Sequence, residues 1–434
     1  MNHLVRIWKN KDLRKKILFT LFIILILRAV AHITVPGVDP RVLEETFQSG
    51  GALSIFAALT GGSMERFSIV MMGLSPYINA SIIVQLMTVA IPKLEAISKE
   101  GDQGRKKINS ITRWLTYPLA FLQSYGMIAL IAQSTHGVEG AFIDYTNPAE
   151  VLPAMITIST GTLLLVWLGE LISEKGIGNG ISMIIFAGIV SSMPSVFGNM
   201  LLNAELGNTG KILPFILFVA FTVLLLMIVV VFTDAHKAIP ITHTSRSAKG
   251  GKSVLPIRVL QAGMIPIIFS VSMITFPSVL AQFLRNADYA WVQKMAEFWN
   301  IHFNSGNPTP EYLALYFILI VAFTYFYVSI TFNPENVAEN LQKRGGFIAG
   351  RRPGKETAEY LGYVSNRMNL WGGFFLGAIA LVPIVFTMFT DLTSSDLIIS
   401  GSGLIIVVGV VLELIRQVNA QLAMHDYDKL AGRM

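Results

Sequence analysis

The glycine-rich run Gly176-Ile177-Gly178-Asn179-Gly180 is the segment whose spacing most resembles a phosphate-binding loop. A nucleotide-binding loop of that kind follows a strand and carries a lysine that reaches the phosphates. This run lacks that lysine and follows a long apolar segment. We therefore interpret it as a tight turn in which the glycines adopt positive φ.

Two histidines, His236 and His243, lie near Asp234 and are the best candidates for metal ligands. The chain contains no cysteine, and the two histidines do not have the HExxH spacing of a zinc enzyme. We expect no catalytic residues, no metal site and no cofactor, so the chain is not predicted to be an enzyme.

The composition excludes several classes of protein. The chain has 434 residues, of which 53% are hydrophobic and 14% are charged, and its mean hydropathy is +0.58. A soluble domain is roughly 25% charged, because polar side chains must cover its surface. An ordinary cytosolic enzyme, a disordered protein and a disulfide-stapled secreted domain are therefore excluded. The composition indicates a polytopic membrane protein.

Apolar stretches of membrane-spanning length recur along the chain. A spanning helix needs about 20 mostly apolar residues, and its backbone polar groups must bond within the segment. We predict an all-α fold with ten transmembrane helices, at residues 17–35, 67–90, 114–133, 151–169, 180–197, 212–232, 259–284, 312–332, 370–390 and 397–419.

Basic residues predict the orientation, because Lys and Arg are retained on the cytoplasmic side of a membrane. With the N-terminus inside, most of the 33 Lys and Arg fall in cytoplasmic segments, so both termini are predicted to be cytoplasmic. Within the tenth apolar segment, Glu413 and Arg416 are one helical turn apart. We expect them to form a local ion pair.

A matched motif relates the two halves of the chain. Residues 73–78 and 263–268 both read G-x-x-P-x-I, and each lies in the second segment of a five-helix half. Proline removes a backbone donor and clashes with the preceding turn, so both helices are expected to bend or be irregular there. Interrupted helices at corresponding positions point to a path at the repeat interface. Because each half has an odd number of helices, the repeat is inverted.

The predicted division of the chain follows from these segments. A cytoplasmic N-terminal segment (1–16) precedes the N-terminal half (17–197), and a hinge loop (198–211) leads to the C-terminal half (212–419) and a cytoplasmic tail (420–434). The apolar segment 53–64 is too short to span, so it is expected to be an interfacial or a re-entrant helix.

The motif residues expected to line the path are apolar: Leu74, Ile78 and Ile268. A narrow ring of branched aliphatic side chains excludes water and ions yet can deform, which is typical of a channel seal. A carrier places polar ligands at its midpoint. A secondary transporter of a small or lipidic solute, built on the same inverted repeat, is the alternative.

Two predicted cytoplasmic loops, 233–258 and 333–369, are long and rich in basic residues. Large basic loops are typical of docking to another macromolecule or to anionic lipid headgroups. In the second loop, Gly350-Arg351-Arg352-Pro353-Gly354 predicts a stiff, exposed turn.

Several motifs occur together and in order along the chain: Pro76–Ile83, Glu100–Lys107, Trp167–Glu170, Gly176–Ser182, Asn333–Glu335 and Arg352–Gly354. With them the chain resembles, over essentially its whole length, the bacterial SecY family, the central subunit of the general protein-secretion channel. The resemblance implies a multi-pass channel in the plasma (inner) membrane for unfolded secretory polypeptides, with a lateral gate between the second and seventh helices.

The resemblance also implies partners and site residues. The partners would be the small membrane subunits SecE and SecG, the motor ATPase SecA, which would hydrolyse the ATP, the ribosome, signal peptides and membrane lipids. The pore ring would consist of Leu74, Ile78, Ile181, Ile185, Ile268 and Ile406. The plug would contain Leu53, Ile55, Phe56 and Leu59, and the lateral gate Asn79, Ser81, Ser272 and Phe276. Docking of the motor or ribosome would use Arg246, Arg258, Arg351 and Arg352.

Overall fold

The computed structural model describes residues 8–36, 38, 63–64, 66–98, 100–134, 143, 147–203, 209–243, 253–284, 289–303, 309–389 and 401–431. The candidate plug residues Leu53, Ile55, Phe56 and Leu59 lie outside these ranges, as does Arg246.

Every apolar segment predicted from the sequence overlaps a helix. In chain order these helices are α2 (Lys11–Val30), α5 (Ser75–Ala90), α7 (Asp102–Ser134), α8 (Pro148–Lys175), α9 (Gly180–Asn203), α10 (Thr209–Asp234), α11 (Ile265–Leu284), α13 (Pro310–Thr331), α15 (Lys355–Phe389) and α16 (Gly401–Ala431).

The local sequence explains where several helices begin. The side chain of Asn10 accepts hydrogen bonds from the backbone N–H groups of Asp12 and Leu13, at 3.1 and 3.3 Å, and so caps α2. Asn147 and Thr309 cap α8 and α13 in the same way, and each is followed directly by proline. Proline is favourable in a first turn because its missing N–H would have no helical partner there.

Length and composition mark several helical stretches as able to cross a membrane. Within the described part of the chain there are four: Pro148–Lys175, Pro310–Lys343, Lys355–Phe386 and Gly403–Met424. A fifth is formed by α5 and α6 (Pro92–Ser98) if this pair, bent by 106°, counts as one span. Shorter apolar helices lie within α9, α10 and α11.

The two G-x-x-P motifs are helix starts rather than kinks. Helices α5 and α11 begin one residue before Pro76 and Pro266, so both prolines lie in first turns. Just before them Gly73 has φ 55° and Gly263 has φ 62°, a left-handed conformation that glycine adopts without strain. Residues 67–74 and 259–264, predicted as helix, are irregular. Each proline therefore marks the start of a helix and does not bend a continuous one.

A small antiparallel sheet corrects the all-α prediction. Strand β1 (His236–His243) pairs with β2 (Ser253–Arg258) and with β3 (Gly346–Ile348), in the order β2-β1-β3. The two basic loops thus form one unit together with α14 (Pro334–Lys343). Ile239 of β1 and Ile257 of β2 pack with Ala338 of α14 and Leu361 of α15 in a separate apolar core. Alternate residues of a strand face this core, which explains how loops rich in charged residues still form a sheet.

Several predicted boundaries are shifted. Helix α2 begins inside the predicted N-terminal segment 1–16, and α9 and α10 extend into the predicted hinge loop 198–211. Helix α15 begins within the basic loop 333–369, and α16 continues through most of the predicted tail. Hydropathy locates the apolar part of each helix but not the polar turns that extend it.

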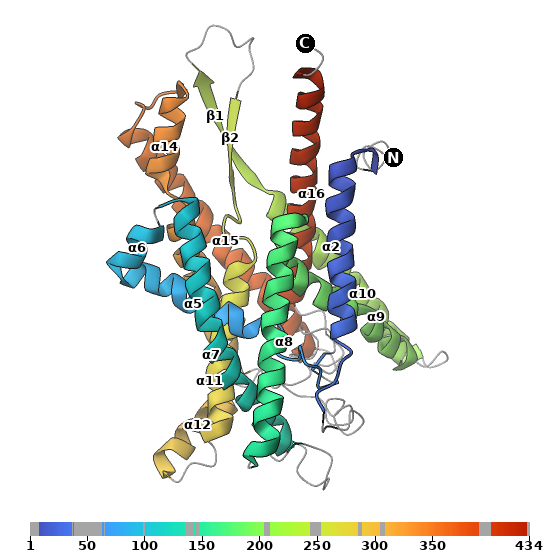
Figure 1. Ribbon diagram of the computed structural model, residues 1–434. Coiled ribbons are helices and arrows are strands. Elements are labelled where there is room, and N and C mark those ends of the chain that lie inside the picture. Colours follow the sequence, from blue (N-terminus) through green and yellow to red (C-terminus); the bar gives the residue numbers. More distant parts are fainter. Residues whose placement is uncertain are drawn as a thin grey trace.

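Figure 1 shows how the elements are arranged. The long helices run alongside one another, and β1, β2 and α14 project at one end of the molecule. Helix α2 begins and α16 ends at that same end, whereas α12 (Ala290–His302) lies at the opposite end. The basic loops, the start of α2 and the end of α16 therefore lie at the same end of the molecule.

The irregular segment before α5 packs closely on α8. A Cβ atom at Gly161 of α8 would lie 1.9 Å from the carbonyl oxygen of Ile69. In the same segment Met64, Phe67 and Met71 are each at most 1% exposed. The absence of a side chain at Gly161 therefore allows the segment before α5 to pack against the backbone of α8.

We expect Gly161→Ala to destabilise the protein by about 1–3 kcal/mol, because the backbone atom that an added methyl group meets cannot move aside. Gly198→Ala in α9 is the control, since no atom lies within 4 Å of an added Cβ there. That variant should be neutral or more stable by up to about 1 kcal/mol. Thermal unfolding in detergent measures both, and equal melting temperatures would contradict the packing argument.

Candidate functional site

The six aliphatic residues assigned to the pore ring lie in one hydrophobic cluster. Leu74 and Ile406 are buried, and the other members are partly buried. None carries a polar group, so the cluster can close a path but offers a solute neither charge nor hydrogen bond. The members come from four parts of the chain: Leu74 and Ile78 at the start of α5, Ile181 and Ile185 in α9, Ile268 in α11 and Ile406 in α16.

Met264 belongs to the same cluster and is 7% exposed, although the sequence assignment omitted it. The internal repeat was the available signal, because Met264 occupies in the second motif the position of Leu74 in the first. The N–H of Ile78 donates to the Leu74 carbonyl oxygen at 2.9 Å, and that of Ile268 donates to the Met264 carbonyl oxygen at 3.4 Å. The two motifs thus bring equivalent pairs of side chains into the cluster.

The glycine-rich turn at 176–180 fixes the start of α9. Gly178 has φ 88°, which confirms the predicted turn with positive φ. Its N–H donates to Oε1 of Gln417 in α16 at 2.9 Å, and the N–H of Ile177 donates to Oγ1 of Thr20 in α2 at 3.1 Å. Sequence reasoning missed Thr20 and Gln417 because these partners are 157 and 239 residues from the groups they bind.

The residues assigned to the lateral gate lie on α5 and α11, two helices in contact. Asn79 and Ser81 of α5 and Ser272 of α11 are each partly buried. Oγ of Ser81 accepts a hydrogen bond from Nε2 of Gln85 at 3.1 Å. Phe276 follows Ser272 by one turn of α11. Which of these side chains face each other across the two helices stays a prediction.

The arginine turn at 350–354 has the conformation that its glycines predict. Gly350 has φ 80° and Gly354 has φ 99°. Between them, the N–H of Arg352 donates to Oε2 of Glu356 at 3.1 Å, and the carbonyl oxygen of Arg352 accepts from Oγ1 of Thr357 at 2.8 Å. The backbone of Arg352 is thereby held on both sides at the start of α15.

The candidate docking arginines differ in their surroundings. The guanidinium of Arg351 lies over the ring of Tyr360, 5.1 Å from its centroid, a cation–π contact. Arg352 is exposed, and its guanidinium has no bonding partner among the residues that the structure describes. Arg258, opposite His236 at the end of β2, is also exposed. Arg352 and Arg258 are thus both exposed, whereas the guanidinium of Arg351 lies against a ring.

The predicted ion pair between Glu413 and Arg416 is wrong. Nη2 of Arg416 donates to Oδ1 of Asp234 at 2.8 Å and to the carbonyl oxygen of Thr233 at 3.2 Å, both at the end of α10. This hydrogen bond lowers the pKa of Asp234. Arg416 binds there because the last turn of α10 offers a carboxylate together with the free carbonyl oxygens of a helix end.

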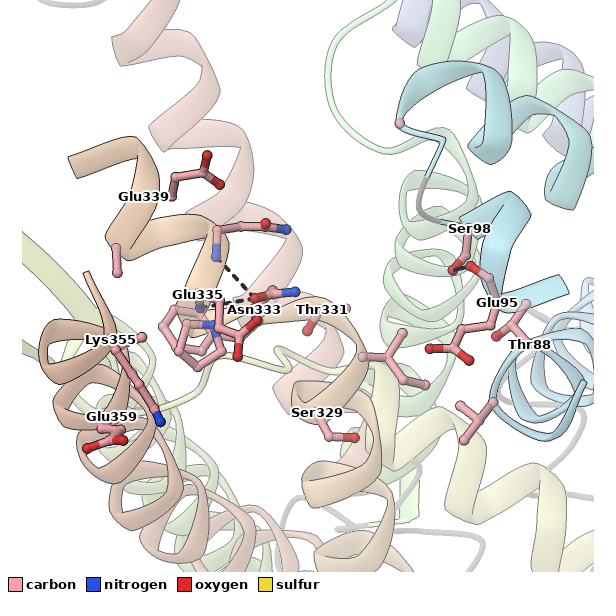
Figure 2. A pocket seen from close by; sticks show the side chains of 18 of the residues that line it. Thr88, Glu95, Ser98, Ser329, Thr331, Asn333, Glu335, Glu339, Lys355 and Glu359 are labelled. Carbon is pink, nitrogen blue, oxygen red and sulfur yellow. Dashed lines mark hydrogen bonds between the residues drawn. The ribbon is translucent and has the colours of Figure 1, made fainter. Parts of the chain in front are cut away.

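A cleft of about 1220 Å³ lies between the α5–α7 region and the α13–α15 region. Figure 2 shows Thr88, Glu95 and Ser98 on one side and Glu335 and Asn333 on the other. Asn333 caps α14 by accepting a hydrogen bond from the N–H of Glu335 at 3.0 Å. The cleft is larger than a usual small-molecule pocket of about 300–1,000 Å³. Its lining includes both polar and apolar side chains.

Sequence comparison finds relatives over nearly the whole chain. Residues 68–415 match the SecY family model. The protein translocase subunit SecY of Streptomyces scabiei is 37% identical over 438 residues, which cover 98% of each chain. The subunit of the same name from Corynebacterium glutamicum is 38% identical over 449 residues, which cover 99% of this chain and 100% of the relative.

Solved structures share the fold. One described as the structure of a protein conducting channel has a TM-score of 0.65 at 18% identity, over 95% of this chain and 93% of that chain. A channel in a canine ribosome-channel complex from the endoplasmic reticulum has a TM-score of 0.62 at 17% identity, with the same coverage. The structures support the architecture, and the sequence relatives establish the family. The chain therefore belongs to the SecY family.

Proposed function

We propose that this chain is the central subunit of a protein-conducting channel, which passes unfolded polypeptides across a membrane and releases membrane segments laterally between α5 and α11. The observation that carries the proposal is the aliphatic cluster built from α5, α9, α11 and α16. An apolar neck excludes ions when closed and deforms when occupied. Such a neck suits substrates of varied sequence, because it forms no specific hydrogen bond or ion pair with the side chains that pass through it.

The proposal includes ten membrane crossings, arranged as two inverted halves with both termini in the cytoplasm. Three observations support this topology: the overlap of each predicted segment with a helix, the matched left-handed conformations of Gly73 and Gly263, and the shared location of the basic loops and terminal helix ends (Figure 1). Because Lys and Arg are retained inside, that end faces the cytoplasm of a cell whose plasma (inner) membrane holds the channel.

A secondary transporter of a small or lipidic solute fits these observations less well. A carrier needs polar ligands at its midpoint, whereas the six residues assigned to the ring are all aliphatic. Relatives at 37% and 38% identity are named protein translocase subunits. In this proposal the chain is a passive channel, and ATP hydrolysis belongs to a partner.

The proposed partners are SecE, SecG, the ATPase SecA, the ribosome, signal peptides and membrane lipids. Exposed apolar side chains on α2 and α10, such as Leu25, Val223 and Met227, support contacts with small membrane subunits or lipid. The exposed guanidinium of Arg352 supports docking of the motor or ribosome, because arginine pairs with both carboxylate and phosphate. The segment 53–64 is proposed as the plug.

Replacing Ile78, Ile181 and Ile268 together with glycine should make the resting channel leak ions, because the shortened side chains leave a neck wide enough for water. Ion conductance of the reconstituted channel in planar bilayers measures the leak. The matched control replaces Ile83, Val190 and Met273 with glycine. These three residues are exposed and lie on the same three helices. A tight triple variant, or an equal leak in the control, would contradict the assignment of the ring.

The lateral gate can be tested by an engineered disulfide, since the chain has no other cysteine. Asn79→Cys and Phe276→Cys should crosslink in the closed channel and block translocation until a reductant is added, because a disulfide requires Cα atoms within about 7 Å. The negative control pairs Asn79→Cys with Val223→Cys on α10. Crosslinking of the control pair alone would refute the proposed arrangement.

Arg352→Glu should reduce motor-driven translocation of a secretory precursor at least about tenfold, because a charge reversal removes the paired hydrogen bonds to an acidic partner. Arg352→Lys should be intermediate, since it keeps the charge and loses the planar fork. Reconstituted vesicles measure translocation and stimulation of the ATPase, with Arg344→Glu as an exposed control. Wild-type rates for Arg352→Glu would exclude its role in docking.

A further inference from the structure

Helix α12 connects the ends of two apolar helices, α11 and α13. It packs against α11 and lies at the end of the molecule opposite β1 and β2 (Figure 1). The stretch that contains α13 is long and apolar enough to cross a membrane. A segment that joins the ends of such helices lies at the level where a membrane meets water.

Two faces of α12 have ordinary roles. Val292 and Ala296, one turn apart, are 8% and 3% exposed and form its buried face. Lys294 and Glu297 are exposed and form a charged face. A helix in water would need only these two faces, one packed on the protein and one solvated.

The third face of α12 is apolar and uncovered. Trp291, Met295 and Phe298 are spaced four and three residues apart, so they lie on one side of the helix. They are 67%, 53% and 54% exposed. Ile301, which is 59% exposed, lies one turn after Glu297 and therefore on the side of Lys294 and Glu297. Soluble surfaces seldom carry an apolar patch of this extent without a partner.

Lipid is the partner that the position of this face favours. Helix α12 lies between α11 and α13 in the chain, and both of these helices contain apolar stretches suited to a membrane. Tryptophan, whose ring is amphipathic, is enriched where a membrane meets water. A helix with one apolar and one charged face lies in the plane of the interface, with the apolar residues inserted among the lipids.

We propose that α12 is a membrane-interface helix whose stripe of Trp291, Met295 and Phe298 inserts into the leaflet on the side opposite β1 and β2. Lys294 and Glu297 remain in water. Through its contact with α11, the inserted helix holds the end of α11 at a fixed depth. Any effect of this anchoring on the lateral gate rests on the proposed role of α11 in that gate. The insertion of α12 into the membrane does not depend on that role.

The test uses the full chain, which has no cysteine, reconstituted in vesicles of phosphatidylethanolamine and phosphatidylglycerol. Met295→Cys on the stripe and Glu297→Cys on the charged face each receive a nitroxide label. Paramagnetic relaxation compares collisions with oxygen, which concentrates in lipid, and with a water-soluble nickel complex. The label at 295 should collide several times more with oxygen than with nickel, and the label at 297 should show the reverse.

Similar nickel access at both positions would overturn the proposal. Low access of both reagents to the label at 295 would overturn it as well, because a protein partner would then cover the stripe. A measurement without labels uses brominated lipids as quenchers of tryptophan fluorescence. Trp291→Phe should remove more of the quenchable fluorescence than Trp299→Phe, and the opposite order would count against insertion. Neither readout requires translocation, so failure of the proposed channel function leaves both interpretable.

Discussion

The contact of aliphatic side chains from both halves of the chain is the interaction on which the rest of the structure depends. Leu74 and Ile78 of the first half belong to the same apolar cluster as Met264 and Ile268 of the second, and none of these side chains carries a charge or a hydrogen-bonding N–H or O–H group. Hydrophobic and dispersion contacts are non-directional. Two surfaces held in this way can separate and close again without finding specific partners, whereas a buried polar network would have to re-form each of its bonds.

The frame around this cluster is held by more specific interactions. The turn at 176–180 is bound by Thr20 of α2 and Gln417 of α16, and it fixes the start of α9. Gly161 lets the segment before α5 pack on the backbone of α8. Arg416 joins α16 to α10 through Asp234. Directional bonds and close backbone contacts thus position helices whose ends meet in a deformable apolar centre.

The parts of this fold that local sequence determines were predictable. Apolar segments marked each long helix because hydropathy is a property of neighbouring residues, and the repeated motif identified Ile78 and Ile268 as equivalent. The conformation at Gly178 followed from residue type alone. The six residues assigned through the family resemblance came together in one cluster, although their function as a ring is a proposal.

Features that depend on distant residues were not predictable. The strand pairing of Ile241 with Ile348 joins two loops that are separate in the sequence. Arg416 was expected to bind its helical neighbour, but a partner on α10 offers a carboxylate and a helix end together. Proline in the motifs was expected to distort a helix, and only the structure shows that each helix begins there. These outcomes depend on which segments lie side by side.

The proposed channel requires the polypeptide to pass through the aliphatic cluster. A secretory precursor arrested halfway through the channel, with a photoreactive residue at the midpoint of its path, tests this most directly. Mass spectrometry of the crosslinked peptides should identify Ile78, Ile181, Ile268 or Ile406 as the attachment sites. Crosslinks confined to exposed positions outside the cluster, such as Ile83 and Met273, would show that the polypeptide takes another path.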